Sequence, residues 1–169
     1  YRQVADSLDF QMVRALLRSY VGEPGESVAW FDAAIAERKH NSEVAVRYGL
    51  VAALLRDQQL ARARKELATL ERMAPPHPMI EAIAGHVLLE SGDAAGAAAR
   101  FEAALARYPN KMQLVYDYPE ALLKAGRAGQ AAAFAETQLQ RFPQDGPRRR
   151  IAAQAYDAQG KALKQHHHQ

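Results

Sequence analysis

Apolar and polar residues alternate along the chain in short segments that have the spacing of amphipathic helices. In the segment 94–107, Ala97, Phe101, Ala104 and Leu105 follow the i, i+4, i+7, i+8 pattern of one buried helix face. This pattern predicts an all-α fold built from antiparallel helices. The helices are expected near 4–21, 26–39, 44–57, 60–73, 78–91, 94–107, 112–125, 128–141 and 146–159, with a last short one from about 161.

Glycine and proline recur along these segments at one fixed interval. The 34-residue interval separates Gly92, Gly126 and Gly160 from one another, and likewise Pro75, Pro109 and Pro143. A period of 34 residues is that of the tetratricopeptide repeat, a helix-turn-helix unit that stacks into a superhelical solenoid. The sequence therefore predicts a right-handed tetratricopeptide solenoid of about four full units and a partial C-terminal unit.

The units differ in how closely they follow the repeat. The segment 44–77 has Gln58 and Gln59 in place of the turn glycine, and in 10–43 the turn is expected at Pro24-Gly25. In 112–145, Pro119 falls inside the first helix and is expected to kink it, either as a tolerated defect or as a widening of the groove. We expect one solenoid over 1–169, with units near 10–43, 44–77, 78–111, 112–145 and a partial unit at 146–169 whose second helix is cut short.

Composition narrows the class of protein. Of the 169 residues, 49% are hydrophobic and only 8% aromatic, which suits close helix packing better than strands. No apolar run is long enough for a membrane span. The absence of cysteine excludes disulfides and thiolate chemistry but decides no compartment, and the net charge of +3 is too small to argue for nucleic acid.

Residues that could carry chemistry are scattered. No two histidines have the helical spacing of a zinc motif: His40 and His77 fall in predicted loops, and His86 stands alone on a first helix. The run from His166 to His168 is either native sequence or a purification tag. No serine lies in a nucleophile elbow, and no carboxylate pair stands out. We therefore expect no catalytic residue, metal or cofactor within this chain.

A basic run opens the last predicted first helix. Arg148, Arg149 and Arg150 are consecutive, so at least one of them must face solvent however the helix is rotated. They are read either as solvated surface or as a docking site for an acidic partner.

The concave groove that first helices form in such a solenoid is the expected binding surface. Its mixture of aromatic, methionine and charged side chains is typical of surfaces that bind proteins, although some of these side chains could instead pack on a neighbouring helix. A chaperone-type carboxylate clamp is disfavoured, because lysine and asparagine are absent from the groove positions that it needs. The groove residues expected to bind a partner are Tyr48, Leu55, Met79, His86, Leu89, Tyr116, Glu120, Lys124 and Arg150.

Several stretches of sequence narrow the family further. The segments 45–50 (AVRYGL), 60–67 (LARARKEL), 108–110 (YPN) and 120–127 (EALLKAGR) resemble the C-terminal repeat region of BepA-like bacterial zinc metallopeptidases. The segment 7–15 (SLDFQMVRA) resembles the join that follows the peptidase domain in that family.

The resemblance implies a non-catalytic half of a periplasmic enzyme that acts in outer-membrane protein assembly and quality control. Zinc would then lie in an H-E-x-x-H domain before Tyr1, and no position here matches that motif. The implied partners are outer-membrane proteins, their assembly machinery and the peptidase domain itself. A free-standing adaptor of the cytoplasm, or of a secretion or pilus system, is the alternative.

Overall fold

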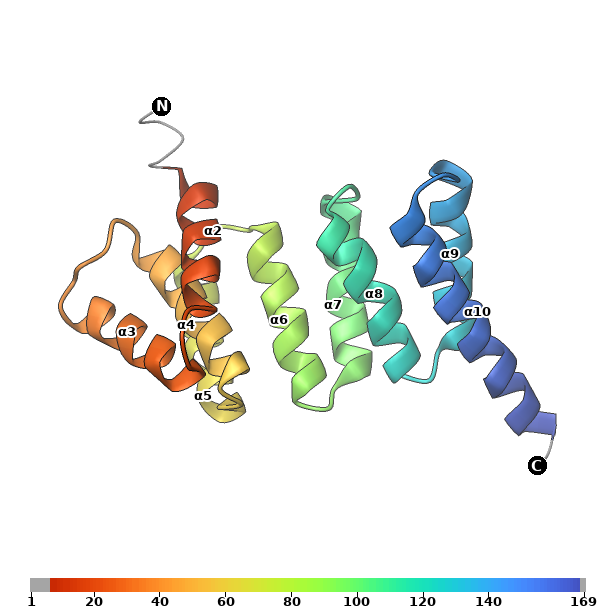
Figure 1. The fold of residues 1–169 in the computed structure, drawn as a ribbon, viewed down its shortest axis with the longest axis horizontal. Coiled ribbons are helices and arrows are strands. Elements are labelled where there is room, and N and C mark those ends of the chain that lie inside the picture. Colours follow the sequence, from red (N-terminus) through yellow and green to blue (C-terminus); the bar gives the residue numbers. More distant parts are fainter. Residues whose placement is uncertain (1–6, 168–169) are drawn as a thin grey trace. The chain divides into compact units, whose positions relative to one another are not determined.

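The computed structural model describes residues 7–167, and within this range the chain forms nine α-helices and no strand (Figure 1). The all-helical class expected from the apolar pattern is therefore confirmed. In chain order the helices are α2 (Leu8–Ser19), α3 (Pro24–Ala36), α4 (Glu43–Arg56), α5 (Leu60–Met73), α6 (Pro78–Glu90), α7 (Ala94–Arg107), α8 (Met112–Lys124), α9 (Ala128–Arg141) and α10 (Gly146–His167).

The 34-residue period reappears in the places where helices begin. The helices α5, α7 and α9 begin at Leu60, Ala94 and Ala128, each 34 residues after the one before. The intervening helices α6, α8 and α10 begin at residues 78, 112 and 146, again 34 residues apart. The repeat read from glycines and prolines is thus a repeat of helix pairs.

The turn within each pair needs a residue with left-handed backbone conformation. Gly92 and Gly126 adopt it, with φ of 86° and 76°, and Gln58 adopts it at the equivalent place with φ of 59°. Around Gln58 the backbone N–H groups of Gln58 and Gln59 donate to the carbonyls of Leu55 and Leu54, at 3.1 and 2.9 Å. This is the hydrogen-bond pattern of a Schellman C-cap, so the turn survives the loss of its glycine.

Gln58→Gly is expected to stabilise the chain by about 0.5–1 kcal/mol, because glycine has no Cβ to strain at positive φ. Urea unfolding followed by circular dichroism would measure the gain. Gln59→Gly is the matched control: its φ is −88°, so glycine there should bring no gain. Equal stabilisation by both variants would contradict the role given to the backbone at residue 58.

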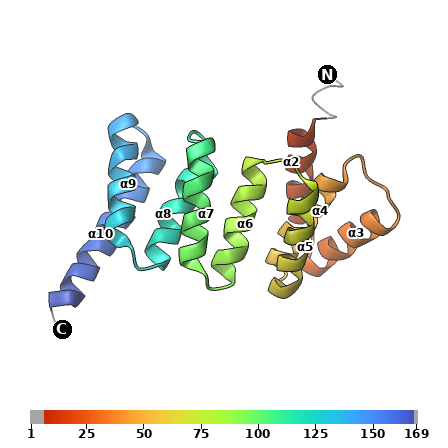
Figure 2. The same ribbon diagram turned by 180° about the vertical axis from the view of Figure 1, so that it is seen from behind.

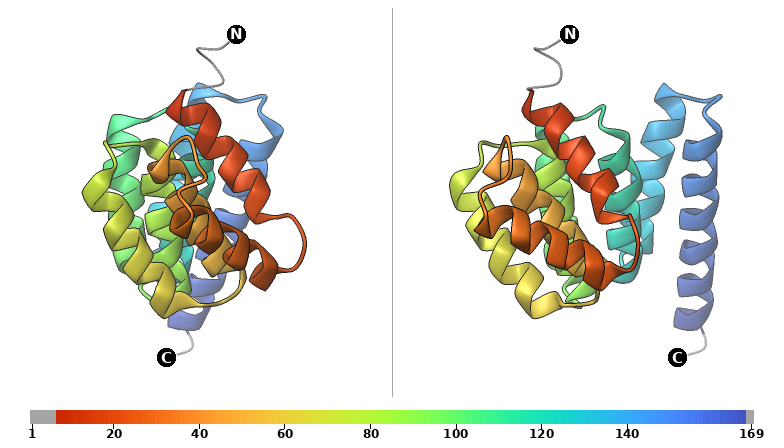
Figure 3. Two further views of the ribbon diagram at one scale, coloured as in Figure 1. Left: turned by 90° about the vertical axis from the view of Figure 1, so that its left-hand side faces the viewer. Right: turned by 60° about the vertical axis from the view of Figure 1, so that its left-hand side comes forward.

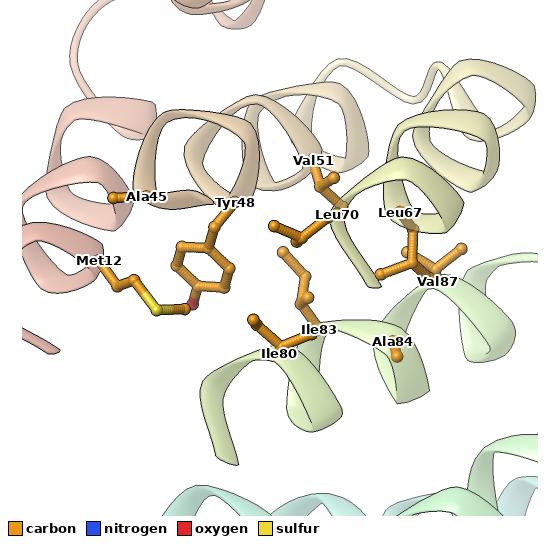
Figure 4. Close-up of a cluster of buried hydrophobic side chains, with 10 residues drawn as sticks. All are labelled: Met12, Ala45, Tyr48, Val51, Leu67, Leu70, Ile80, Ile83, Ala84 and Val87. Atoms are coloured by element: carbon orange, nitrogen blue, oxygen red, sulfur yellow. The ribbon is translucent and has the colours of Figure 1, made fainter. Parts of the chain in front are cut away.

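The chain divides into two compact units, Tyr1–Ser91 and Gly92–Gln169. The boundary falls at the turn between α6 and α7, inside the repeat expected at 78–111. In the first unit, α2 and α3 both pack on α4 and scarcely contact each other, while α4 also packs on α5 (Figures 1 and 2). The first unit's core contains the ten side chains of Figure 4, which come from α2, α4, α5 and α6.

The first helix pair departs from the repeat. The turn expected at Pro24-Gly25 is wrong: Pro24 is the first residue of α3, a position where proline is favoured because its missing N–H costs nothing. The turn lies earlier, where Gly22 has a φ of 72°. Helix α2 begins after its N-cap Ser7, whose hydroxyl accepts a hydrogen bond from the Phe10 N–H, and the start expected at residue 4 lies outside the described residues.

In the second unit, α8 runs from Met112 to Lys124 and contains Pro119, so the proline does not end the helix. The residue before this proline, Tyr118, packs edge to face on Phe134 of α9, with ring centroids 4.9 Å apart.

The turn expected at Gly160 is wrong, because α10 runs unbroken from Gly146 to His167 beside α9 (Figure 3). After each true turn glycine, the residues five and nine positions later are buried, as Ala97 and Phe101 are. The residue five positions after Gly160 is the polar Gln165, which does not supply the apolar side chain that a second helix would bury. A helical glycine costs about 1 kcal/mol but does not end a helix by itself.

Candidate protein-binding surfaces

Tyr48 is the clearest correction to the predicted groove. The side chain is only 2% exposed, and its ring points into the core of the first unit toward Met12 of α2 and Ile80 of α6 (Figure 4). Burial raises the pKa of the Tyr48 phenol above its ordinary value. Tyr48 is therefore a packing residue that joins three helices, and it is not available to a partner.

The other groove residues expected in the first unit are half-buried. Leu55 of α4 and Met79 of α6 pack against the same core cluster, and His86 and Leu89 of α6 are each partly covered. These four side chains expose only part of their surface. Leu55 and Met79 therefore pack on neighbouring helices, which is the alternative that the sequence leaves open for some groove positions.

The groove residues expected in the second unit are exposed. Tyr116, Glu120 and Lys124 lie four residues apart on α8, which places them in one row along the helix. Tyr116 is 38% exposed, and the Lys124 ammonium lies 3.2 Å from the Glu120 carboxylate. Arg150 is exposed on α10, a helix that packs against α8 within the same unit. The structure thus keeps four of the nine expected residues on the surface of one unit.

The arginine run divides into structural and exposed members. The buried Arg148 guanidinium donates to the Gln138 side-chain oxygen at 2.9 Å, pairs with Asp145, and lies 3.9 Å from the centre of the Phe142 ring. Its neighbour Arg149 donates to the Pro143 carbonyl at 3.0 Å. Arg149 and Arg150 are both exposed, so at most two of the three arginines can face a partner.

No group of three histidine, aspartate or glutamate side chains that could hold a metal occurs among the described residues. His166 and His167 lie exposed on the last turn of α10, and His168 falls outside the described range. In the same part of the chain, no helix combines the length and apolarity that crossing a membrane requires.

A pocket of about 620 Å³ lies in the first unit, where the sequence predicted no site. It opens between α2 and α3 and reaches the residues that lead into α4. The residues that line it are Gln11, Arg14, Ala15, Leu17, Arg18, Val21, Trp30, Phe31, Lys39, His40, Asn41, Ser42, Ala45 and Val46.

Exposed apolar side chains gather around this pocket. Leu17 is 64% exposed, Val21 56% and Trp30 45%, and Phe10 and Val13 continue the exposed apolar face along α2. The Arg18 guanidinium lies 4.5 Å from the centre of the Trp30 ring, a cation–π contact at the pocket wall.

The sequence carries a partial signal for this surface. The spacing of Phe10, Val13 and Leu17 marks an apolar helix face, but such a face normally predicts burial. It stays open here because α2 rests on α4 through Met12 and Ala15, on the opposite side, and α3 diverges from α2. Sequence periodicity does not report that divergence.

Comparison with known proteins identifies the class of fold. Residues 88–156 match the family model of the tetratricopeptide repeat. YrrB, described as a TPR protein with an unusual peptide-binding site, is similar in structure: the TM-score is 0.63 at 17% identity, over 96% of this chain and 84% of that chain. A mutant of MamA is similar with a TM-score of 0.62 at 15% identity, over 97% of this chain and 93% of that chain.

No curated protein sequence gives a significant match to this chain. At identities of 15–17%, the two structural likenesses concern the fold. The fold of the chain is thus similar to that of tetratricopeptide-repeat proteins, and residues 88–156 carry the repeat itself. Helical solenoids of this kind generally serve protein–protein interaction and are generally non-catalytic.

Proposed function

We propose that the chain is the non-catalytic, partner-binding C-terminal region of a bacterial periplasmic zinc metallopeptidase that acts in outer-membrane protein assembly and quality control. The observation that carries partner binding is the exposed row of Tyr116, Glu120 and Lys124 on α8. Packing within the second unit leaves this row uncovered, and tyrosine is enriched at protein interfaces. That YrrB, a protein of similar fold, has a peptide-binding site supports the same reading.

The proposed parent enzyme rests on the resemblance of the segments 45–50, 60–67 and 120–127 to BepA-like repeats. The described residues do not fit a zinc site, because they hold no suitable group of ligands. The metal and the hydrolytic step would therefore belong to a preceding domain, and this chain would supply binding to outer-membrane proteins, their assembly machinery or the peptidase domain.

A free-standing adaptor is the second candidate, and the same exposed row on α8 would serve it equally well. The gene separates the two. A reading frame that extends upstream to a signal peptide and H-E-x-x-H supports the metallopeptidase, whereas a frame that starts just before Tyr1 overturns it.

Tyr116→Ala is expected to weaken capture of a purified outer-membrane assembly component about tenfold, the loss typical of removing an interface tyrosine. The measurement is a quantitative pulldown with the whole chain, with circular dichroism to confirm that the variant is folded. Tyr156→Ala is the matched control, since Tyr156 is a 44% exposed tyrosine of the same unit that does not belong to the row. Unchanged capture by Tyr116→Ala, or equal loss in both variants, would contradict the α8 row as the site.

A further inference from the structure

We propose that the pocket between α2 and α3 binds an acidic polypeptide segment that inserts an aromatic or large aliphatic side chain. This site is separate from the row on α8 and belongs to the other unit of the chain. The proposal rests on the charge of the pocket and on its apolar walls.

The charge of the pocket has one sign. Arg14, Arg18 and Lys39 line it, and no aspartate or glutamate is among its lining residues. Within residues 7–167, neither Arg14 nor Arg18 forms an ion pair, and their contacts are with the rings of Phe10 and Trp30. The Lys39 ammonium lies 3.1 Å from the Glu37 carboxylate. Both side chains are largely exposed, and such a surface ion pair contributes little. Carboxylates of a ligand would therefore meet two arginines that have no ion-pair partner among the described residues, and a lysine whose only pair is weak.

The walls of the pocket are apolar. Leu17 and Val21 on one side and Trp30 on the other are about half exposed or more, and the fully buried Phe31 closes the pocket beneath them. Exposed aliphatic side chains beside a concave surface favour a partner that brings apolar side chains of its own. The volume of about 620 Å³ can admit such a side chain together with its flanking residues.

These features favour a polypeptide over a nucleic acid. Binding of single strands relies on a series of aromatic rings for successive bases, and the pocket offers one exposed ring, Trp30. Leu17 and Val21 are aliphatic and offer a base no ring on which to stack. An acidic segment with one bulky apolar residue uses both the cations and the walls.

Trp30 provides a direct readout because it is the only tryptophan in the chain. The probe is a synthetic peptide without tryptophan, Glu-Asp-Glu-Phe-Asp-Glu-Leu, titrated into the whole chain at low salt. We expect a saturable change in Trp30 emission and weaker binding as salt is raised, because exposed charges are screened. With Trp30→Phe the emission change should vanish, while anisotropy of a dye-labelled peptide still reports binding.

Charge variants test the recognition itself. Arg14→Gln combined with Arg18→Gln is expected to weaken the peptide about tenfold or more, since each cation lost removes a charge-assisted contact. Arg14→Lys with Arg18→Lys should restore part of the affinity. The matched control is Arg64→Gln with Lys65→Gln, which removes two exposed cations from α5 in the same unit. This control should change the affinity less than about twofold.

Four results would overturn the proposal. The first is absence of saturable binding, and the second is equal loss of affinity in the control pair. The third is that the affinity stays the same when Gln and Asn replace Glu and Asp in the peptide, or when Ala replaces its Phe and Leu. The fourth is tighter binding of a single-stranded oligonucleotide of the same charge. Tyr116→Ala should bind the peptide normally, so the α8 row and this pocket can fail independently.

Discussion

Tyr48→Ala is expected to lower the free energy of unfolding by about 3–5 kcal/mol, the cost of removing a large aromatic side chain from a packed core. The ring is 2% exposed and joins α2, α4 and α6 (Figure 4), so its loss leaves a cavity where three helices meet. Urea unfolding followed by circular dichroism would measure the effect as a lower midpoint. Had Tyr48 lain in a groove, the same variant would have kept its stability and lost only a partner.

Two controls separate packing from other effects of the substitution. Tyr48→Phe keeps the ring and should cost less than about 1.5 kcal/mol, as volume-conserving core changes do. Tyr156→Ala removes an exposed tyrosine and should stay within about 0.5 kcal/mol of the parent chain. If Tyr48→Ala were as stable as Tyr156→Ala, the core position of Tyr48 would be wrong.

The regular part of the fold could be predicted because helix spacing and turn residues repeat. Each helix from α4 to α10 begins within one residue of its expected start, and glycine or its substitute marks the turns before α5, α7 and α9. The first helix pair has no such period, and Pro24, which suggests a turn in the sequence, is instead the first residue of α3. At Gly160, the residue type predicts a turn, but the polar Gln165 stands where a second helix needs an apolar residue, and α10 continues.

The candidate sites were harder to predict, because exposure depends on how helices cross. Tyr48 and Tyr116 stand at the same position of their repeats, 44–77 and 112–145, so the repeat pattern predicts that both are exposed. Tyr48 is buried because α2 and α6 both pack on α4, which shields its ring from two sides. Likewise, nothing in the sequence around Arg14 or Trp30 indicates that the two residues line one pocket.

Gly49→Val is expected to destabilise the chain by about 3 kcal/mol, at the upper end of the cost of overpacking a core. A Cβ at Gly49 would lie 3.0 Å from the Ala15 Cβ and closer still to the Phe31 ring, where α2 and α3 pack on α4. Phe31 is 1% exposed and cannot swing into open space. The fall in the urea midpoint measures the cost. Gly129→Val is the control, because only the flexible end of Gln159 lies near that glycine.

The collision with Phe31 can be isolated with a second substitution. Phe31→Leu removes ring atoms that a side chain at residue 49 would meet, so the double variant should lose at least about 1 kcal/mol less than the sum of the two single losses. If the losses of unfolding free energy were additive, the close approach of α4 to the Phe31 ring would not explain why residue 49 is glycine. Because Phe31 also closes the α2–α3 pocket, Gly49→Val should weaken the acidic peptide too, whereas Gly129→Val should leave its binding unchanged.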